Sequence, residues 1–310
     1  MEVGDICKQQ LIPPKTDLKK MSIVTDFPKN LGNKSYPQPK PHHNFELFYG
    51  KNNRNQIKEL GRGGNGVIFL VTWDRSSRSE RGDSIDDKIV LKYPLTEPEY
   101  EPERVMKVLK GYHHHIIPYK VVHDQHDNPF VIMQQANGDI FDLLRLDLTP
   151  SFRNKMIAYY AKAIGQLWRK RIVFTDMKPE NLLYQCHTPE SSGVGESGGL
   201  ALYFGDIGAF ANEGEEEYDY EVEPPECDGV IDKNFCLFTL GLMAIGMYDL
   251  KYERPKGEGT FIKNFYNPVK EQILRKFRNR NIQKIVLQLL SPYREYRDKL
   301  TVNEAVEWLT

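Results

Sequence analysis

A short segment near the middle of the chain brings together three side chains that could act on a phosphate. Asp176, Lys178 and Asn181 supply a carboxylate, an ammonium group and an amide. A carboxylate can orient a hydroxyl, an ammonium can neutralise a phosphate, and an amide oxygen can bind a metal ion. A second acid, Asp206, stands between glycines after a predicted short apolar strand and offers another metal ligand. This set suits phosphoryl transfer, which needs positioning and charge neutralisation more than a covalent nucleophile.

A glycine-rich segment and a lysine lie upstream of these residues. Gly61, Gly63 and Gly66 form a GxGxxG pattern, in which the backbone can approach phosphate oxygens closely. A strand is expected to follow, not a helix, which disfavours a dinucleotide-binding turn and leaves open a glycine-rich hairpin without a ligand. Lys92 ends the apolar stretch 89–91 and is either a ligand-binding lysine or an ordinary surface lysine.

In this order and spacing, the four motifs resemble those of the eukaryotic-type protein kinase family, from about residue 55 to residue 310. The resemblance implies ATP and Mg²⁺ as cofactors and a protein hydroxyl as acceptor. It implies that Asp176 orients the hydroxyl and Lys178 steadies the transferred group. Asn181 and Asp206 would bind magnesium, a hard ion that takes oxygen ligands. The segment Lys178–Asn181 is more similar to serine/threonine kinases than to tyrosine kinases.

The same resemblance assigns the nucleotide-binding residues. Glycines would cover the phosphates, an apolar side chain would cap the adenine, and a lysine would hold the α- and β-phosphates. A larger side chain would border the adenine pocket, the next segment would offer backbone hydrogen bonds, and an acid would meet the ribose. In that order the positions are Gly61, Gly63 and Gly66; Ile68; Lys92; Met133; Gln134 to Ala136; and Asp139.

Two ion pairs are also expected from the family pattern. Lys92 should pair with a glutamate of the helix that begins near residue 102, and Glu103 is the prediction. Glu101 is the alternative, since it gives better apolar spacing. The segment 224–226 resembles the end of an activation segment, so Glu226 needs an arginine partner, for which Arg297 is the candidate.

The pattern of apolar residues predicts an α+β, bilobal protein-kinase-like fold. Residues 1–45 are polar and proline-rich, which predicts an extended or disordered tail. Residues 46–136 carry short β-branched stretches at 67–71, 88–91 and 130–133, which predict a small β-rich N-lobe with one helix. Residues 137–310 change to helical spacing, over 151–170, 235–248, 281–290 and 301–309, which predicts a larger helical C-lobe. A ligand would sit in a cleft between the lobes.

The chain departs from the family pattern at the catalytic loop. Phe174 and Thr175 stand where the family has histidine and arginine. Phe174 can replace histidine by packing, but Thr175 cannot bind a phosphate as an arginine does. No serine or threonine lies between Asp206 and Glu226. We therefore expect a loop held ready by packing around Phe174 and independent of phosphorylation in the activation segment.

The activation segment is instead strongly acidic. One hypothesis is that it attracts basic protein substrates or binds the lysine-bearing N-terminal tail; the alternative is a solvated loop. The acidic residues are Glu213, Glu215, Glu216, Glu217, Asp219, Glu221 and Glu223.

Two further departures concern the support of the loop. Cys236 occupies the place of an aspartate that holds the loop backbone in the family, and cysteine is a poor hydrogen-bond partner. Asp232 is a candidate substitute. Asn181 and Asp206 are also further apart than usual, and the glycine- and serine-rich stretch 188–199 predicts a flexible turn between them.

Composition excludes several classes of function. A net charge of −1 and a pI of about 6.7 argue against nucleic-acid binding. The longest apolar stretch, 237–248, is too short to span a membrane and predicts a buried helix, and the first residues do not read as a signal peptide. Four cysteines without close pairs indicate reduced thiols and a cytoplasmic protein, in a host-cell cytosol if the source is a virus or parasite. The histidine triplet 113–115 is expected to be structural, and nothing in the sequence sets the oligomeric state.

Three functions remain open at this stage. The first is an active serine/threonine protein kinase, favoured because the lysine, loop aspartate and metal aspartate are all present. The second is a pseudokinase scaffold that binds nucleotide without useful transfer, to which Thr175 and Cys236 lend support. The third is a kinase-like enzyme with a non-protein acceptor. All three share one fold, and a fold does not fix function.

Overall fold

The fold is taken from a computed structural model of the whole chain. It describes residues 56–62, 66–73, 87–94, 102–112, 114–123, 129–186, 200–216, 224, 229–253 and 260–310. The predicted N-terminal tail, Gly63, Glu101 and Glu226 lie outside these residues. So do Cys7, Cys227, the stretch 188–199 and the acidic residues from 217 to 223.

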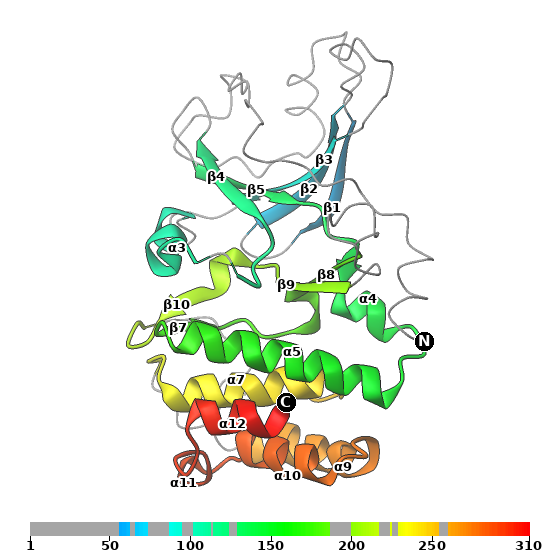
Figure 1. The fold of residues 1–310 in the computed structure, drawn as a ribbon, viewed down its shortest axis with the longest axis vertical. Helices are drawn as coiled ribbons and strands as arrows, with labels where there is room; N and C mark the ends of the chain where they lie inside the picture. Colours follow the sequence, from blue (N-terminus) through cyan, green and yellow to red (C-terminus); the bar gives the residue numbers. More distant parts are fainter. Residues whose placement is uncertain are drawn as a thin grey trace, which may run out of the picture.

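An antiparallel sheet of five strands makes up the first part of the fold, at the top of Figure 1. Its strand order is β1-β2-β3-β5-β4, and helix α3 (Pro102–Leu109) lies beside it. Strand β2 alternates between buried Val67, Phe69 and Val71 and partly buried Ile68 and Leu70, as expected for a strand with one face on a core. The strands are β1 (Gln56–Arg62), β2 (Gly66–Trp73), β3 (Asp87–Pro94), β4 (Tyr119–His123) and β5 (Pro129–Gln134).

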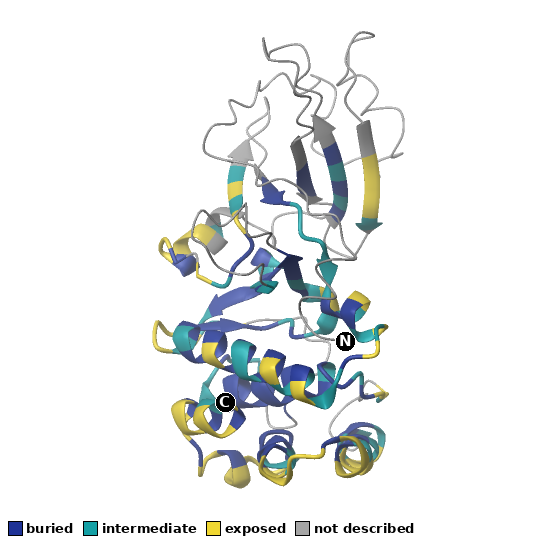
Figure 2. Cartoon of the chain, turned by 45° about the vertical axis from the view of Figure 1, so that its right-hand side comes forward, coloured by how far each residue is buried: buried dark blue, intermediate teal, exposed yellow. Residues whose placement is uncertain are grey.

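Helices dominate the second part, where α5, α7 and α12 pack against one another (Figure 1). Helix α7 is buried from Asn234 to Ile245, as predicted for the apolar stretch in this region. The helices that surround it bury one face and expose the other (Figure 2). The helices of this second part are α4 (Ile140–Leu144), α5 (Pro150–Trp168), α7 (Lys233–Gly246), α9 (Asn267–Lys276), α10 (Arg280–Leu289), α11 (Arg294–Arg297) and α12 (Val302–Leu309), with a π-helix η3 (Phe261–Tyr266).

Short strands and turns lie between the sheet and the helices. Strands β6, β8 and β9 form one small sheet, and β7 pairs with β10 in another. Each is too short to show a clear period in the sequence, and only the short apolar strand expected before Gly205, which is β9, was predicted. The elements are β6 (Gly138–Asp139), β7 (Ile172–Phe174), β8 (Leu182–Cys186), β9 (Leu200–Phe204), β10 (Phe210–Asn212) and the 3₁₀ turns η1 (Pro179–Asn181) and η2 (Ile207–Ala209).

The observed architecture confirms the predicted α+β, bilobal fold, with a sheet first and helices after it. The helix expected after Pro102 is present, and the four predicted helical stretches correspond to α5, α7, α10 and α12. Helices α4 and α9 were not predicted, because each buries only two residues. No helix among the described residues is long and apolar enough to cross a membrane.

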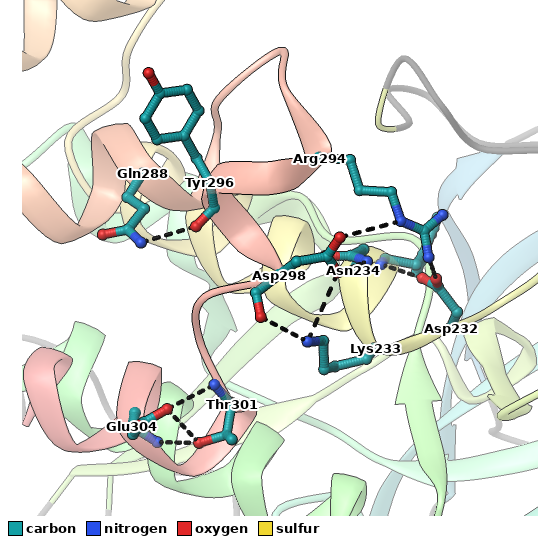
Figure 3. Close-up of polar contacts among 10 residues, drawn as sticks. Asp232, Lys233, Asn234, Gln288, Arg294, Tyr296, Asp298, Thr301 and Glu304 are labelled. Carbon is teal, nitrogen blue, oxygen red and sulfur yellow. Dashed lines mark hydrogen bonds and ion pairs between the residues drawn. The ribbon is translucent and has the colours of Figure 1, made fainter.

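A polar network ties the start of α7 to α11 near the C-terminus (Figure 3). Asp232 accepts a hydrogen bond from the backbone N–H of Phe235 at 2.8 Å and so caps α7. Its second oxygen lies 3.0 Å from the Arg294 guanidinium. Asp298 accepts from the Asn234 amide at 2.9 Å and lies 3.8 Å from the Lys233 ammonium. The network therefore links two segments that are about sixty residues apart.

We expect Asp298 to stabilise the fold at neutral pH and to lose that effect in acid. The Asn234 hydrogen bond, with the charges of Arg294 and Lys233, holds the pKa of Asp298 below its usual range. A depressed folded pKa gives stability that is present above the unfolded value, near pH 4, and lost as pH falls through the folded value. Since the side chain is half exposed, Asp298→Asn should cost only about 0.5–1 kcal/mol at pH 7. Urea unfolding of both proteins between pH 7 and pH 3.5 measures this; a constant difference across the range would contradict it.

Candidate functional site

An ion pair between Lys92 and Asp206 links the five-stranded sheet to the segment that follows β9. The Lys92 Nζ atom lies 2.7 Å from an Asp206 carboxylate oxygen. Lys92 projects from β3, directly opposite Ile68 on β2, and only 8% of its surface is exposed. Asp206 follows β9 and is 24% exposed at its side chain. A lysine this buried is not the ordinary surface lysine left open by the sequence.

The loop after β7 gathers the other candidate residues around one carboxylate. The Lys178 ammonium lies 2.8 Å from Asp176 Oδ2. The Asn181 amide donates to the same oxygen at 2.7 Å and to the Asp176 backbone carbonyl at 2.9 Å. All three side chains are partly exposed, so a ligand can reach them. An asparagine that donates through its nitrogen keeps its amide oxygen as an acceptor, for example for a metal ion.

Antiparallel pairing of β8 with β9 brings Asn181 close to Asp206. Leu182 pairs with Phe204, and the Gly205 N–H donates to the Asn181 carbonyl at 2.8 Å. The ladder runs without a shift to the pair Cys186–Leu200. The unusually long spacing noted in the sequence is therefore accommodated at the far end of the hairpin, and the end that holds the two candidate metal ligands keeps its register.

Asp206 and Thr175 are both fixed by the short turn η2. The Gly208 N–H donates to Asp206 Oδ1 at 3.0 Å, which caps the turn. Thr175 is buried, and both its N–H and its hydroxyl donate to the Ala209 carbonyl, at 2.8 and 3.0 Å. Thr175 therefore contributes a neutral hydrogen bond inside the protein, where the family pattern would place a cation.

Four aromatic rings pack behind the loop. Phe174, Phe204 and Phe210 have ring centroids 4.7–5.9 Å apart, and Tyr160 packs edge-on against Phe204 at 5.5 Å. All four side chains are at most 1% exposed. Aromatic pairs in these orientations add stability beyond the area that they bury. This packing agrees with the prediction that Phe174 replaces histidine by apolar contact.

The predicted adenine-side residues lie on one continuous path from β5 to β6. Met133 is buried between Val90 of β3 and Tyr119 of β4. The Gln134 N–H donates to the Pro118 carbonyl at 2.9 Å, and the half-buried Ala136 follows. Asp139 then begins α4, where it accepts from the Asp142 N–H at 2.8 Å.

The environment of Asp139 opposes its ionisation. Burial raises the pKa of Asp139, and the charges of Asp142 and Glu180 act in the same direction, against the hydrogen bond from the Asp142 N–H. A cationic or hydroxyl-bearing ligand placed here would favour the carboxylate by supplying a charge or a donor.

For several predicted site residues, the structure leaves the residue itself, its side chain or its expected partner undescribed. Gly61 and Gly66 lie in β1 and β2, on either side of the undescribed Gly63. Glu103 lies in α3, but its side chain is outside the described residues, so its pairing with Lys92 stays a prediction. Arg297 is fully buried and donates to the Ser291 carbonyl, while its expected partner Glu226 is outside them.

The suggested role of Asp232 as a support for the loop is wrong. Both its oxygens are used elsewhere, one on the α7 cap and one on Arg294. Cys236 is fully buried in α7, and burial raises the pKa of its thiol well above the usual value, so it is a neutral packing group. Neither residue supplies the carboxylate that the family has here.

The contacts of His115, one of the two described residues of the histidine triplet, agree with the structural role expected for the triplet. The His115 ring lies 3.0 Å from the Tyr159 hydroxyl, which itself donates to the Leu202 carbonyl at 2.9 Å. Within the described residues, no three His, Cys, Asp or Glu side chains are grouped to hold a metal ion. A metal held by Asn181 and Asp206 would therefore need further ligands from water and phosphate, which is the usual condition of Mg²⁺.

Sequence reasoning missed two arginines that contact the acidic activation segment. Arg104 of α3 lies 3.0 Å from Glu215, and Arg171, just before β7, lies 2.6 Å from Glu213. The acidic stretch was visible in the sequence, but its partners were not, because they are 111 and 42 residues away. No local pattern could have found them.

Comparison with known proteins agrees with this geometry. The family model of the protein kinase domain matches residues 54–191. A serine/threonine-protein kinase of Drosophila yakuba is 29% identical over 130 residues, which cover 41% of this chain and 17% of that protein. A calcium/calmodulin-dependent protein kinase type 1 of Caenorhabditis elegans is 28% identical over 129 residues, 40% of this chain and 36% of that protein. Each of these matches therefore covers 36% or less of the relative's own length.

Residues 54–191 are therefore similar to the protein kinase domain of the eukaryotic-type family. The matched residues include Lys92, Asp176, Lys178 and Asn181, and end before Asp206. The position of Asp206 beside Lys92 extends the family geometry past the matched segment.

Gly205 is a position where the site has no room for a side chain. A Cβ atom there would lie 2.6 Å from two carbon atoms of Leu183 on the paired strand. We expect Gly205→Ala to cost about 1–3 kcal/mol of unfolding free energy, because overpacking forces neighbours to shift. Adding Leu183→Ala makes room, so the double variant should lose less than the sum of the two single changes. Urea unfolding of all four proteins measures the coupling, and simple additivity would contradict the clash.

Proposed function

We propose that the protein transfers the terminal phosphoryl group of ATP to serine or threonine hydroxyls of protein substrates. The observation that carries this proposal is the Lys92–Asp206 ion pair, held beside the group formed by Asp176, Lys178 and Asn181. These residues come from a sheet strand, a loop and a hairpin end that are distant in sequence. Such a convergence of charges is what phosphoryl transfer requires.

Each polar group then has a distinct task. Asp176 accepts or orients the proton of the attacking hydroxyl, since it is the carboxylate of the loop group and its side chain is 26% exposed. Lys178, 2.8 Å from it, neutralises charge on the phosphoryl group in transit. Lys92 holds the α- and β-phosphates, and Glu103 is the proposed partner that orients it.

The donor set fits ATP and magnesium. Asn181 and Asp206 offer oxygen atoms on adjacent chain segments, the ligand type that Mg²⁺ prefers. A bound Mg²⁺ would neutralise charge on the phosphates. On the nucleotide side, we assign Gly61, Gly63 and Gly66 to the phosphates, Ile68 to the adenine and Asp139 to the ribose. Met133, Gln134 and Ala136 would border the base.

Specific residues distinguish the proposed function from two alternatives. A pseudokinase scaffold would bind nucleotide without transfer, and the missing carboxylate at Cys236 favours it. Against it, Lys92, Asp176 and Asp206 are all present, with Lys92 paired to Asp206 and the loop lysine Lys178 paired to Asp176. A non-protein acceptor is disfavoured by the sequence resemblance of segment 224–226 to a peptide-binding activation segment.

The proposal includes a basic protein substrate, attracted by the acidic activation segment, and a cytoplasmic location, as the cysteine composition predicts. It also keeps the predicted organisation into a tail (1–45), an N-lobe (46–136) and a C-lobe (137–310). No role for nucleic acid or a membrane is proposed.

Replacement of Asp176 tests the catalytic part of the proposal. Asp176→Asn keeps the shape of the side chain but removes the proton acceptor, so transfer from γ-labelled ATP to a basic protein should fall at least about a hundredfold. Asp249→Asn, which removes a carboxylate from an exposed ion pair with Lys251, is the matched control and should transfer normally. Equal, negligible labelling by the unmodified protein and Asp176→Asn, with nucleotide binding retained, would favour the pseudokinase instead.

Phosphatase treatment tests how the site is held ready. Thr175 binds a backbone carbonyl and has no positive charge to offer a phosphate. We therefore expect an enzyme pretreated with a broad phosphatase, which is then removed, to keep its initial rate of transfer. Loss of all activity after the treatment, restored by renewed phosphorylation, would sink this expectation.

A further inference from the structure

Glu215 joins helix α3 to the segment that leads into α7. One of its carboxylate oxygens lies 3.0 Å from the Arg104 guanidinium on α3. The other accepts from the Asn212 amide at 2.6 Å. With a separate donor on each oxygen, the carboxylate is held in one orientation. Both members of the ion pair are about one-third exposed, so water and solutes can reach them.

The backbone around Glu215 is also fixed. The Ile231 N–H donates to the Glu215 carbonyl at 3.0 Å, and the Gly214 N–H donates to the Ile231 carbonyl at 2.8 Å. Glu216 forms a bridge with Val230 just beyond. The carboxylate that meets Arg104 is therefore anchored to the chain that leads into α7.

The helix that carries Arg104 packs on the segment that follows Asp206. Helix α3 contacts η2 and β10, which together span residues 207–212. That segment is tied to the catalytic loop through the Ala209 carbonyl and Thr175. The Arg104–Glu215 contact fastens α3 at the far end of the same segment. A shift of α3 would thus be felt at Asp206 and at the loop.

We propose that Glu215 is a positioning residue, whose carboxylate holds Arg104 and thereby keeps α3 seated against the segment that follows Asp206. This inference rests on the proposed kinase function for its catalytic consequence, but not for the contact itself. A glutamate carries its charge permanently at neutral pH, whereas a phosphate must be added and can be removed. The contact between α3 and the segment that follows Asp206 therefore needs no added phosphate.

Hydrogen exchange of α3 and steady-state kinetics together test the role. In Glu215→Ala, the amides of residues 103–110 should exchange about fivefold faster, and kcat should fall by a similar factor, the upper range for a partly exposed ion pair. The KM for the protein substrate should change little, because Glu215 is engaged with Arg104 and Asn212. Glu213→Ala is the matched control for hydrogen exchange. It removes an ion pair from the same segment, but the partner of Glu213 is Arg171, which is not on α3. Its α3 amides should exchange at the normal rate.

A double variant in which the two charges are swapped completes the test. Arg104→Glu combined with Glu215→Arg restores an ion pair of reversed direction, while the Asn212 amide can turn to present its oxygen. The amide hydrogen-exchange rates of α3 and the kcat should both return to within about twofold of the values for the unmodified protein, since the pair regains its charge attraction. If Glu215→Ala leaves α3 exchange unchanged, or speeds it without lowering kcat, the positioning role is wrong.

The two proposals fail in different ways. An unmodified protein that transfers no phosphate overturns the proposed function, and α3 exchange in Glu215→Ala then decides the structural link by itself. A fully active Glu215→Ala overturns the positioning role and leaves the kinase function standing.

Discussion

The burial of Phe204 is the constraint on which the arrangement of the two parts depends. Its N–H donates to the His115 carbonyl at 2.7 Å, and its carbonyl accepts from the Ile117 N–H at 3.0 Å. These bonds join the end of β9 to the connection between α3 and β4. Its ring, fully buried, packs on Phe174 and Tyr160 from the helical part. Because Asp206 follows two residues later, the metal-side carboxylate has little freedom once Phe204 is in place.

This dependence explains why motif spacing was informative. The loop 176–181, the strand that carries Lys92 and the turn at Asp206 are local sequences whose proposed roles follow from residue type and order. The structure pairs Lys92 with Asp206, gathers Lys178 and Asn181 around Asp176, and joins the two sets through the Gly205–Asn181 backbone hydrogen bond. Helices α5, α10 and α12 were predictable because each buries residues at helical spacing, and α7 because its sequence is apolar along most of its length. The start of α12 carries a capping box between Thr301 and Glu304, a local signal that also stands in the sequence.

What could not be predicted depends on contacts between distant segments. The short strands β6, β7, β8 and β10 exist because partners arrive from elsewhere in the chain, and their own sequences carry too few residues to show a period. The use of Asp232 was misjudged for the same reason: its partner Arg294 is 62 positions away, and only the folded chain reveals it. The pairing of Arg104 with Glu215 belongs to this class as well. Local patterns thus specified the chemistry, while packing specified how that chemistry is held.

The hairpin of β8 and β9 has a consequence for how this chain can vary. Its ladder fixes the residues beside the site at one end and leaves the chain to close at the other, beyond Cys186 and Leu200. Lengthening such a connection is inexpensive, since each doubling of a flexible loop costs only roughly 0.6 kcal/mol of closure entropy. Insertions and deletions between the two strands should thus be nearly neutral for the proposed site, whereas one residue added between Phe204 and Asp206 would displace the Asp206 carboxylate from its place beside Lys92. Related chains should accordingly differ in length between positions 186 and 200 and hardly at all between 204 and 206, and the tip is the natural place to insert a reporter peptide.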